Sequence, residues 1–518
     1  MRRPAGEPAP RWQHNCVRLQ GFLPGGAARY HARSATAPSA ARTSGVLSTR
    51  RGYDAGVTAE GLRASEEKMR RADVPDAAID TFRHYYEELA SGASGLVRED
   101  EIEPVDSVPS LDELSQEDAE GRRALDHTVV IKLNGGLGTS MGMTQAKSLL
   151  PVKEELSFLD VIARQTLELR KAHEARLPLV LMNSFYTRED SLKALERYSD
   201  LESDVPADFV QNKEPKLTVD DLQPVSWPDD PDLEWCPPGH GDLYTALVTS
   251  GMLEALLDKE YEYAFVANAD NLGAVLDTRI LGWFAAEGAP FVMEVADRTA
   301  ADRKGGHIAK RRDDGGLLLR ESGQVADEDQ DAFQDIERHR FFNTNTIWVN
   351  LRALANVLAE RDNVLGLPII RNEKNVDPAD SSSPEVIQIE TAMGAAIGVF
   401  DGAQALRVPR ERFAPVKTTN DLLALRSDCY VLTDDAHVVL APEREDGAPL
   451  VELDDEHFKR IDEFDSHFPE GPPSLLHCRR FAVRGDVTFG RDVVARGEVE
   501  VDADGGERRV EDGTVLEG

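Results

Sequence analysis

Residues 132–148, KLNGGLGTSMGMTQAKS, join an apolar strand pattern to a glycine-rich loop that closes on a lysine. The preceding VVIKL predicts a strand that runs directly into Asn134 and the glycines. Because glycine lacks a Cβ atom, the backbone can curl there and bring its N–H groups close to a ligand. Ligands bind at the carboxyl ends of strands in α/β sheets, where such a loop must lie. The stretch predicts either a nucleotide-binding loop or a purely structural turn.

The spacing within this loop excludes the two familiar phosphate-binding patterns. Lys147 follows Ala146 rather than a glycine, so the loop is not a Walker A motif. Met141 stands where the last glycine of GxGxxG belongs. Lys147 can still return to bound phosphates as a point charge, since it comes nine residues after Gly138.

The composition bounds the class of protein. A chain of 518 residues predicts two or three domains. The formal net charge of −35 repels phosphates and anionic lipid, which argues against nucleic acid or a membrane surface as the main partner. No apolar run approaches the roughly 20 residues that cross a bilayer. The four cysteines lie far apart without a CxxC pair, which predicts neither a zinc framework nor disulfides and favours a reducing cytoplasm.

The first 51 residues differ from the rest, with nine arginines, one acid and no lysine. This composition resembles a transit peptide, although disorder or translation from a start upstream of the true one explains it equally well. We predict a disordered Arg-rich extension over residues 1–55 and a helical region with an acidic linker over 56–125. A central domain over 126–425 and a C-terminal domain over 426–518 complete the predicted organisation.

Apolar runs alternate with amphipathic stretches after the acidic linker. The predicted strands are HTVVIKL, LPLVLMN, YAFVANAD and PFVMEV, and the predicted helices are SFLDVIARQTLELRKAH and TREDSLKALERY. Alternation of this kind predicts an α/β domain with a mainly parallel sheet.

The C-terminus carries two interleaved apolar series with a period of six residues. One series is Phe481, Val487, Val493 and Val499, and the other is Val483, Phe489, Ala495 and Val501. This period predicts a short parallel β-helix, for which an antiparallel hairpin is the alternative. Such modules serve packing or assembly, so we expect that a homo-oligomer, if formed, uses this module.

The order of motifs along the chain decides between these two interpretations of the glycine-rich loop. LNGGLGTSMG with KS, then LMNS, PPGHGD, ANADNLGA, KGG, FNTNTIWVN and APVKTTNDLL follow the order found in UTP–glucose-1-phosphate uridylyltransferases. The chain resembles that family from about residue 60 to its C-terminus. The resemblance implies a Rossmann-like nucleotidyltransferase domain with a mixed, mainly parallel sheet, and a left-handed β-helix at the end. It also implies a reaction in which UTP and glucose 1-phosphate give UDP-glucose and pyrophosphate with Mg²⁺.

The resemblance assigns charged residues to the phosphates and the metal. Lys147 and Lys417 match lysines that contact phosphates, and Asp270 in ANADN matches the metal-binding carboxylate. His240 in PPGHGD is expected to meet the phosphate of glucose 1-phosphate. Many members of the family have proline before the loop lysine, so Ala146 puts the stiffness of the loop in doubt.

The resemblance also assigns the nucleotide and sugar contacts. Uridine is expected to meet Leu133, Gly135, Gly136, Gln211 and Gly239. Glucose is expected to meet Asn268, Gly306, Glu321 and Asn345. Gln211 can offer a donor and an acceptor to the pyrimidine edge.

Two other functions remain open on sequence alone. A related pyrophosphorylase that uses another UDP-sugar, or a UDP-N-acetylhexosamine, differs from this family in only a few pocket residues. A non-catalytic nucleotide-sugar-binding protein would have lost the phosphate lysines or the metal aspartate, whereas Lys147, Lys417 and Asp270 are all present.

Overall fold

The computed structural model describes residues 55–115, 119–378, 380–444 and 447–518, which belong to one compact unit. The predicted Arg-rich extension over residues 1–55 lies outside the described residues except for its last position, where a helix begins. Among the described helices, none is both long enough and apolar enough to cross a bilayer.

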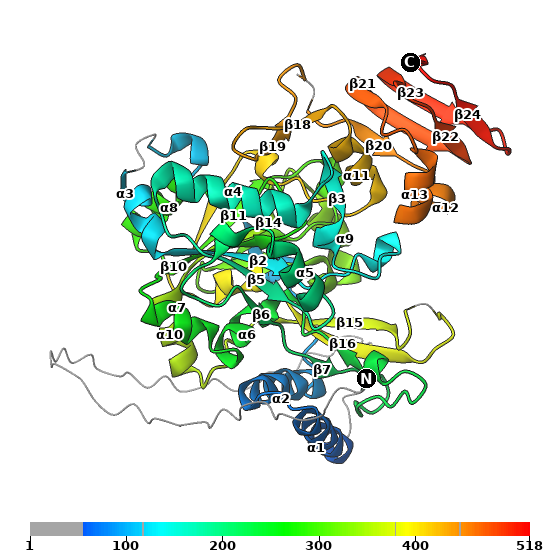
Figure 1. Cartoon of the computed structure of the whole chain (residues 1–518). Helices are drawn as coiled ribbons and strands as arrows, with labels where there is room; N and C mark the ends of the chain where they lie inside the picture. Colours follow the sequence, from blue (N-terminus) through cyan, green and yellow to red (C-terminus); the bar gives the residue numbers. More distant parts are fainter. Residues whose placement is uncertain (1–54, 116–118, 379, 445–446) are drawn as a thin grey trace, which may run out of the picture. The chain divides into compact units, whose positions relative to one another are not determined.

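A ten-stranded sheet forms the centre of this unit, with β1-β12-β14-β10-β2-β5-β6 in order and β11, β13 and β17 attached beside this path (Figure 1). Its strands are β1 (Ile102–Pro104), β2 (Thr128–Asn134), β5 (Leu179–Asn183), β6 (Asp208–Val210), β10 (Tyr263–Asn268), β11 (Phe291–Asp297), β12 (His307–Arg311), β13 (Leu317–Arg320), β14 (Phe341–Asn350) and β17 (Gln404–Arg407).

The sheet contains both parallel and antiparallel strands, as predicted, but only some of its neighbouring strands run parallel. β10, β2, β5 and β6 run parallel, and so do β11 and β17. The ten-residue strand β14 pairs antiparallel with β10, β11 and β12. The expectation of a mainly parallel sheet therefore holds only for the part that carries the glycine-rich loop, because β14 reverses direction beside β10.

Helices cover both faces of the sheet. The helices are α3 (Ala119–Ala124), α4 (Phe158–His173), α5 (Arg188–Leu195), α6 (Leu243–Thr249), α7 (Met252–Asp258), α8 (Thr278–Glu287), α9 (Gln330–Gln334) and α10 (Leu351–Glu360). Val130 of β2 packs in one core with residues of α4 and α8, whereas its neighbours Val129 and Ile131 pack in a second core with α6 and α10. The central strand is thus buried on both faces, as a parallel strand in an α/β sheet requires.

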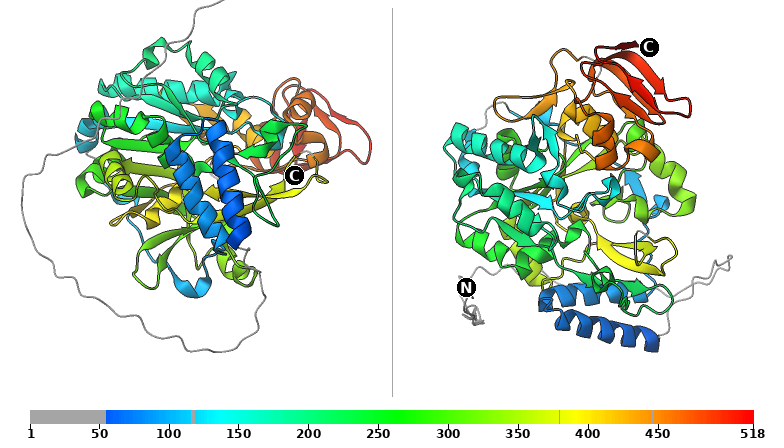
Figure 2. Two further views of the ribbon diagram at one scale, coloured as in Figure 1. Left: turned by 90° about the horizontal axis from the view of Figure 1, so that it is seen from below. Right: turned by 45° about the vertical axis from the view of Figure 1, so that its right-hand side comes forward.

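Two N-terminal helices and a small sheet pack with the second core. α1 (Ala55–Arg71) and α2 (Asp76–Ala90) lie side by side (Figure 2) and bury Met69, Phe82 and Tyr86 in it. The small sheet has the order β15-β16-β8, formed by Ile369–Asn375, Glu385–Thr391 and Leu217–Thr218. β16 ends beside the region where the predicted site residues gather.

The C-terminal part begins with α11 (Thr419–Arg426) and ends in parallel strands. β20 (Leu450–Glu452), β21 (Ser474–Arg484), β23 (Val494–Asp502) and β25 (Val515–Glu517) form one sheet, and β22 (Val487–Phe489) pairs with β24 (Arg508–Val510). Every pairing among these strands is parallel, which contradicts the antiparallel alternative. All eight apolar residues of the six-residue series are at most 4 % exposed.

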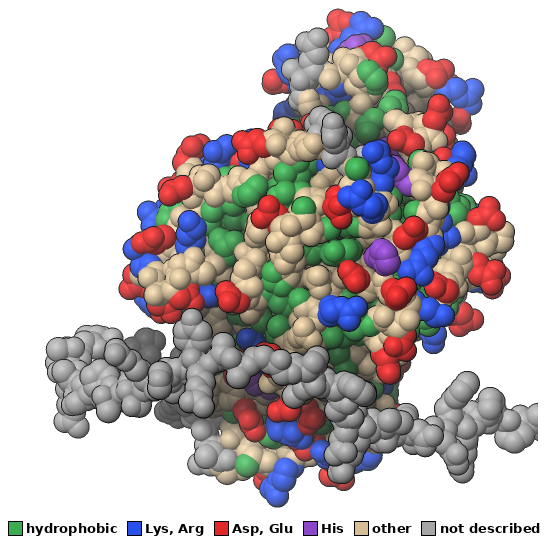
Figure 3. Space-filling model, turned by 90° about the vertical axis from the view of Figure 1, so that its left-hand side faces the viewer, with side chains coloured by type: hydrophobic (Ala, Val, Ile, Leu, Met, Phe, Trp, Pro, Cys, Tyr) green, Lys and Arg blue, Asp and Glu red, His purple; other side chains and the backbone are tan. Residues whose placement is uncertain are grey.

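On the face shown in Figure 3, acidic and basic side chains are interspersed, and apolar side chains gather near the centre. The negative net charge is therefore not gathered into one patch on the face that this view shows.

Candidate active site

The glycine-rich loop leaves β2 and folds back on itself. The Lys147 backbone N–H donates a hydrogen bond to Gly136 O at 3.0 Å, which closes the loop. Asn134 fixes its start, because its side-chain amide donates to Asn183 Oδ1 at 2.7 Å and to Ser191 Oγ at 2.8 Å. The loop thereby brings Lys147 back to the end of β2.

A cavity of about 390 Å³ opens over the carboxyl ends of the parallel strands. Nine of the thirteen predicted site residues line it: Leu133, Gly135, Gly136, Lys147, Gln211, Gly239, His240, Asn268 and Asp270. They come from the ends of β2, β6 and β10 and from the PPGHGD loop, segments far apart in sequence. The location agrees with the general rule for ligands in such sheets.

Lys147 and Asp270 meet at this cavity. Lys147 Nζ lies 2.8 Å from Asp270 Oδ2 and also donates a hydrogen bond to Val416 O. The two side chains are 15 % and 24 % exposed, so both charges remain accessible from the cavity. An ammonium group and a carboxylate at one site can receive phosphate oxygens and a cation respectively.

His240 presents a fixed tautomer. The Met393 N–H donates to His240 Nδ1 at 2.9 Å, so in the neutral ring the proton is on Nε2. Burial lowers the pKa of His240, although Glu390 acts in the opposite direction. The absence of a side chain at Gly239 lets this loop pack closely against Thr391, because a Cβ atom on Gly239 would lie 2.6 Å from Thr391 O. The loop therefore holds a neutral N–H donor for an anion.

Gln211 lies over the glycine-rich loop. Its backbone N–H donates to Asn183 O at 2.8 Å, and a Cβ atom on Gly135 would come within 2.9 Å of its Oε1. The next residue, Asn212, donates to the Asp242 carboxylate from its backbone N–H at 2.5 Å and from its side chain at 2.8 Å. Burial raises the pKa of Asp242 to about 7, against the effect of these hydrogen bonds.

Gly306, Glu321 and Asn345, three of the residues predicted to bind the sugar, form a cluster outside this cavity. Asn343 joins them, because its backbone N–H donates to Gly306 O and its side-chain amide donates to Asn345 Oδ1, both at 2.9 Å. Burial raises the pKa of Glu321, while Asn343 and Lys417 lower it. Gly306 packs directly against the Glu321 carboxylate, which leaves no room for a Cβ atom.

The 3₁₀ helix η12 (Met393–Gly398) connects this cluster to the cavity. Met393 contacts His240 as described, and a Cβ atom on Gly394 would lie 3.1 Å from Asn343 Nδ2. The predicted sugar residues thus lie one short helix away from the histidine that is predicted to bind the sugar phosphate.

Lys417 lies outside the cavity in this structure. Its side chain is exposed and lines a neighbouring hollow of about 570 Å³, and its backbone N–H donates to Asp421 Oδ2 at 2.8 Å. The adjacent Val416 accepts the hydrogen bond from Lys147, so the two lysines lie on neighbouring segments.

Sequence reasoning missed two acids of this region. Glu390 of β16 lines the cavity and accepts from Asn372 Nδ2 at 2.9 Å and from Lys374 Nζ at 3.2 Å. Its strand context, VIQIET, carries no local signal for a site. Asp242 lies inside the PPGHGD motif, two residues after His240, and this position could have indicated that it belongs to the site.

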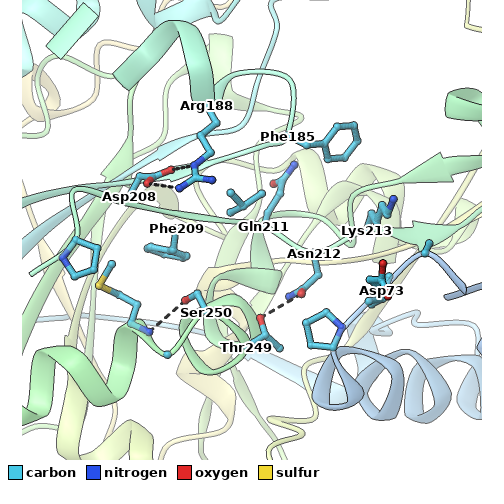
Figure 4. A pocket seen from close by; sticks show the side chains of 17 residues that line it. Asp73, Phe185, Arg188, Asp208, Phe209, Gln211, Asn212, Lys213, Thr249 and Ser250 are labelled. Atoms are coloured by element: carbon cyan, nitrogen blue, oxygen red, sulfur yellow. Dashed lines mark hydrogen bonds and ion pairs between the residues drawn. The ribbon is translucent and has the colours of Figure 1, made fainter. Parts of the chain in front are cut away.

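A second hollow of about 500 Å³ shares Gln211 with the cavity (Figure 4). The Arg188–Asp208 ion pair, 2.7 Å long, and the Thr249–Asn212 hydrogen bond, 3.2 Å long, line it. Phe185 at its edge is 46 % exposed. Gln211 therefore lines both hollows and separates one from the other.

Comparisons with known proteins agree on one family. The profile of the UTP–glucose-1-phosphate uridylyltransferase family matches residues 79–496. The enzyme of that name from Solanum tuberosum is 43 % identical over 406 residues, covering 78 % of this chain and 83 % of the relative. A variant of UDP-glucose pyrophosphorylase from Leishmania major, solved in complex with UDP-glucose, is 44 % identical with a TM-score of 0.82, covering 88 % and 98 % of the two chains. A Trypanosoma brucei protein described as UDP-glucose phosphorylase is 44 % identical with a TM-score of 0.81, covering 89 % and 100 %. The chain belongs to the UTP–glucose-1-phosphate uridylyltransferase family.

Proposed function

We propose that this protein transfers the uridylyl group of UTP to glucose 1-phosphate. A phosphate oxygen of the sugar phosphate forms a bond to the α-phosphorus of UTP, and the bond from that phosphorus to the pyrophosphate leaving group breaks. The products are UDP-glucose and pyrophosphate. The observation that carries the proposal is the single cavity that combines the glycine-rich loop, Lys147, His240 and Asp270.

The nucleophile belongs to the substrate, so the protein needs no serine, cysteine or histidine nucleophile. Its task is to align the two phosphates and to neutralise charge that develops on phosphoryl oxygens. We assign charge neutralisation to Lys147 and Lys417, and donation to the sugar phosphate to His240 Nε2. The backbones of Leu133, Gly135, Gly136 and Gly239 and the amide of Gln211 hold the uridine.

Asp270 is the residue that we propose for Mg²⁺. Magnesium prefers oxygen ligands, keeps several waters and is commonly held by one or two carboxylates together with substrate phosphates. A partly exposed carboxylate at the end of β10, facing the phosphate region beside Lys147, fits that requirement. When bound, the ion offsets negative charge on the phosphates.

Glucose is the proposed sugar, with Asn268, Gly306, Glu321 and Asn345 around its hydroxyl groups. A wrong hydroxyl configuration leaves a buried polar group unpaired, which costs about 1–3 kcal/mol. Galactose 1-phosphate and N-acetylglucosamine 1-phosphate are the discriminating substrates. Comparable turnover with either would favour a broader UDP-sugar or UDP-N-acetylhexosamine pyrophosphorylase.

Substitution of the two lysines tests the assignment. Lys147→Ala should lower kcat by about 10²–10³-fold, the usual cost of removing one preorganised charge stabiliser. Lys417→Ala should also lower turnover strongly, and unchanged turnover would remove Lys417 from the site. Lys171→Ala is the matched control, because Lys171 is 78 % exposed and pairs only with Glu168 of its own helix in the described structure.

We further propose that the C-terminal strands coil into a left-handed β-helix that can join copies of the chain. The parallel pairings and the buried six-residue series support the coil, and Val515 on its last strand, β25, is 50 % exposed. Light scattering of the wild type and of Val515→Asp tests the association. If both proteins had the mass of one chain, the proposed association would be contradicted.

The functional division that we propose separates residues 56–125, 126–425 and 426–518. A cytoplasmic location is also proposed, since Cys236, Cys429 and Cys478 are buried free thiols in the described structure.

A further inference from the structure

Three metal-ligating side chains meet in the C-terminal part, and none of them belongs to the proposed catalytic residues. His457 belongs to α12 (Asp455–Phe458), His467 ends α13 (Ile461–His467), and Asp486 lies in the turn between β21 and β22. One ligand atom of each lies within 4.8 Å of the others. Within the described residues this is the only group of three such side chains with that spacing.

His467 supplies an independent sign that the cluster is built for a ligand. It is only 9 % exposed, and its Nδ1 is buried with no hydrogen-bond partner among the described residues. A buried polar atom without a partner costs free energy, so it calls for an explanation. A metal ion is a partner that this nitrogen can accept.

The distance between His467 and Asp486 fits a shared ion better than a direct bond. His467 Nδ1 lies 3.7 Å from Asp486 Oδ1, which is too long for a hydrogen bond. Two ligands of a tetrahedral zinc ion, with bonds of about 2.0–2.2 Å, are separated by about 3.4 Å. The rings of His457 and His467 stand edge to face at 86°, with centroids 6.2 Å apart, and the partly exposed His457 can rotate toward the other two ligands.

We propose that His457, His467 and Asp486 bind a divalent transition-metal ion of the zinc class, with water as the fourth ligand. Two imidazoles and one carboxylate favour such an ion over Mg²⁺ or Ca²⁺, which prefer oxygen ligands alone. Phe458, 4.5 Å from the His467 ring, provides an apolar wall for the site.

The site would fasten the α12–α13 segment to the parallel strands. Arg460, between these helices, approaches the glycine-rich loop, since a Cβ atom on Gly142 would lie 3.1 Å from its Cζ. The bound metal therefore fixes the position of a segment that contacts the nucleotide loop.

Cobalt(II) titration of the full-length, untagged, chelator-stripped protein tests the site. Tetrahedral cobalt(II) bound through imidazole gives visible d–d bands, and added zinc should displace it. The wild type should bind one equivalent. His457→Ala and Asp486→Asn should each bind at least about tenfold more weakly, because even outer-shell changes cost 10–100-fold. Both replaced side chains are partly exposed, so the fold should survive.

Two matched variants separate this site from others. His437→Ala removes a histidine whose Nδ1 lies 3.8 Å from Asp435 Oδ2 but which belongs to no three-ligand group in the described structure. Asp270→Asn removes the carboxylate proposed for Mg²⁺. Both should keep the cobalt bands, and excess Mg²⁺ should not abolish them. No saturable cobalt binding by the wild type, or equal binding by His457→Ala, would overturn the proposal.

Discussion

Gly135 lies directly against the side-chain amide of Gln211. Its missing Cβ atom leaves space for the Gln211 amide, which would otherwise lie 2.9 Å from that carbon. The glycine-rich loop and the residue proposed for uracil recognition are therefore fitted to each other. Gly135 thus contributes to the nucleotide site through packing as well as through its backbone.

Gly135→Ala should raise the KM for UTP by about tenfold, because displacing a closely packed polar group costs about 1–3 kcal/mol. In a Gln211→Ala background the same substitution should have little further effect, since the obstructing amide is gone. Steady-state kinetics of the two single variants and the double variant check this. Fully additive effects would show that the contact does not couple the two residues.

Asp242 gives a pH-dependent stability with a definite sign. Its pKa rises from 3.8 to about 7 on burial, so between these values the unfolded chain loses a proton that the folded chain keeps. Stability from this group is present below about pH 4 and is lost as the pH rises to about 7. The Tm of the wild type minus that of Asp242→Asn should therefore fall over this interval and level off above it. His240, whose shift acts the other way, is common to both proteins. A difference that stays flat with pH would contradict the assignment.

For individual residues, the sequence located site positions through its motifs. Lys147 and Asp270 could be placed together because each follows a predicted strand and belongs to an ordered motif. The exposed position of Lys417 could not be predicted, since it depends on how the chain leaves β17 before α11. Glu390 was missed because an acid in an alternating strand looks like an ordinary surface position.

At the scale of elements, the six-residue series forms a continuous buried core. Phe489 is fully buried and stacks on Phe468, with ring centroids 5.1 Å apart and planes at 13°. Phe481, at 5.6 Å, packs against it from the same series. The repeat is thus attached to the preceding helices through aromatic contacts.

Phe489→Ala should destabilise the C-terminal part by about 3–5 kcal/mol, through lost burial and the cavity left behind. Val515→Ala, at a half-exposed position, should change stability by no more than about 0.5 kcal/mol. Amide hydrogen exchange over residues 474–517 measures both effects locally. Equal protection in the two variants would show that the repeat is not a cooperative core.

Strand and helix positions in the α/β part followed from hydrophobic pattern, as for β2, α4, β5 and β10. Strand direction did not, because a buried strand such as FFNTNTIWVN has the same local pattern in either orientation. Hence the motif FNTNTIWVN could be placed in the order of motifs, but its strand β14 could not be predicted as the antiparallel neighbour of β10 and β11.

For the whole molecule, a net charge of −35 must be reconciled with substrates that are themselves anions. Charges beyond about 10 Å are largely screened at ordinary ionic strength, so the local cations of the cavity dominate there. Lys147 and the proposed Mg²⁺ at Asp270 supply that local charge. Substrate affinity should therefore depend on the metal more than on the overall charge of the surface.

Pyrophosphate release from UTP and glucose 1-phosphate, measured with Mg²⁺ and then with excess EDTA, tests uridylyl transfer directly. We expect release that requires both substrates and falls to background when EDTA removes the metal. Omission of glucose 1-phosphate should abolish release, because the sugar phosphate is the nucleophile. Release from UTP alone, or no release from the pair while UTP still binds, would contradict uridylyl transfer to glucose 1-phosphate.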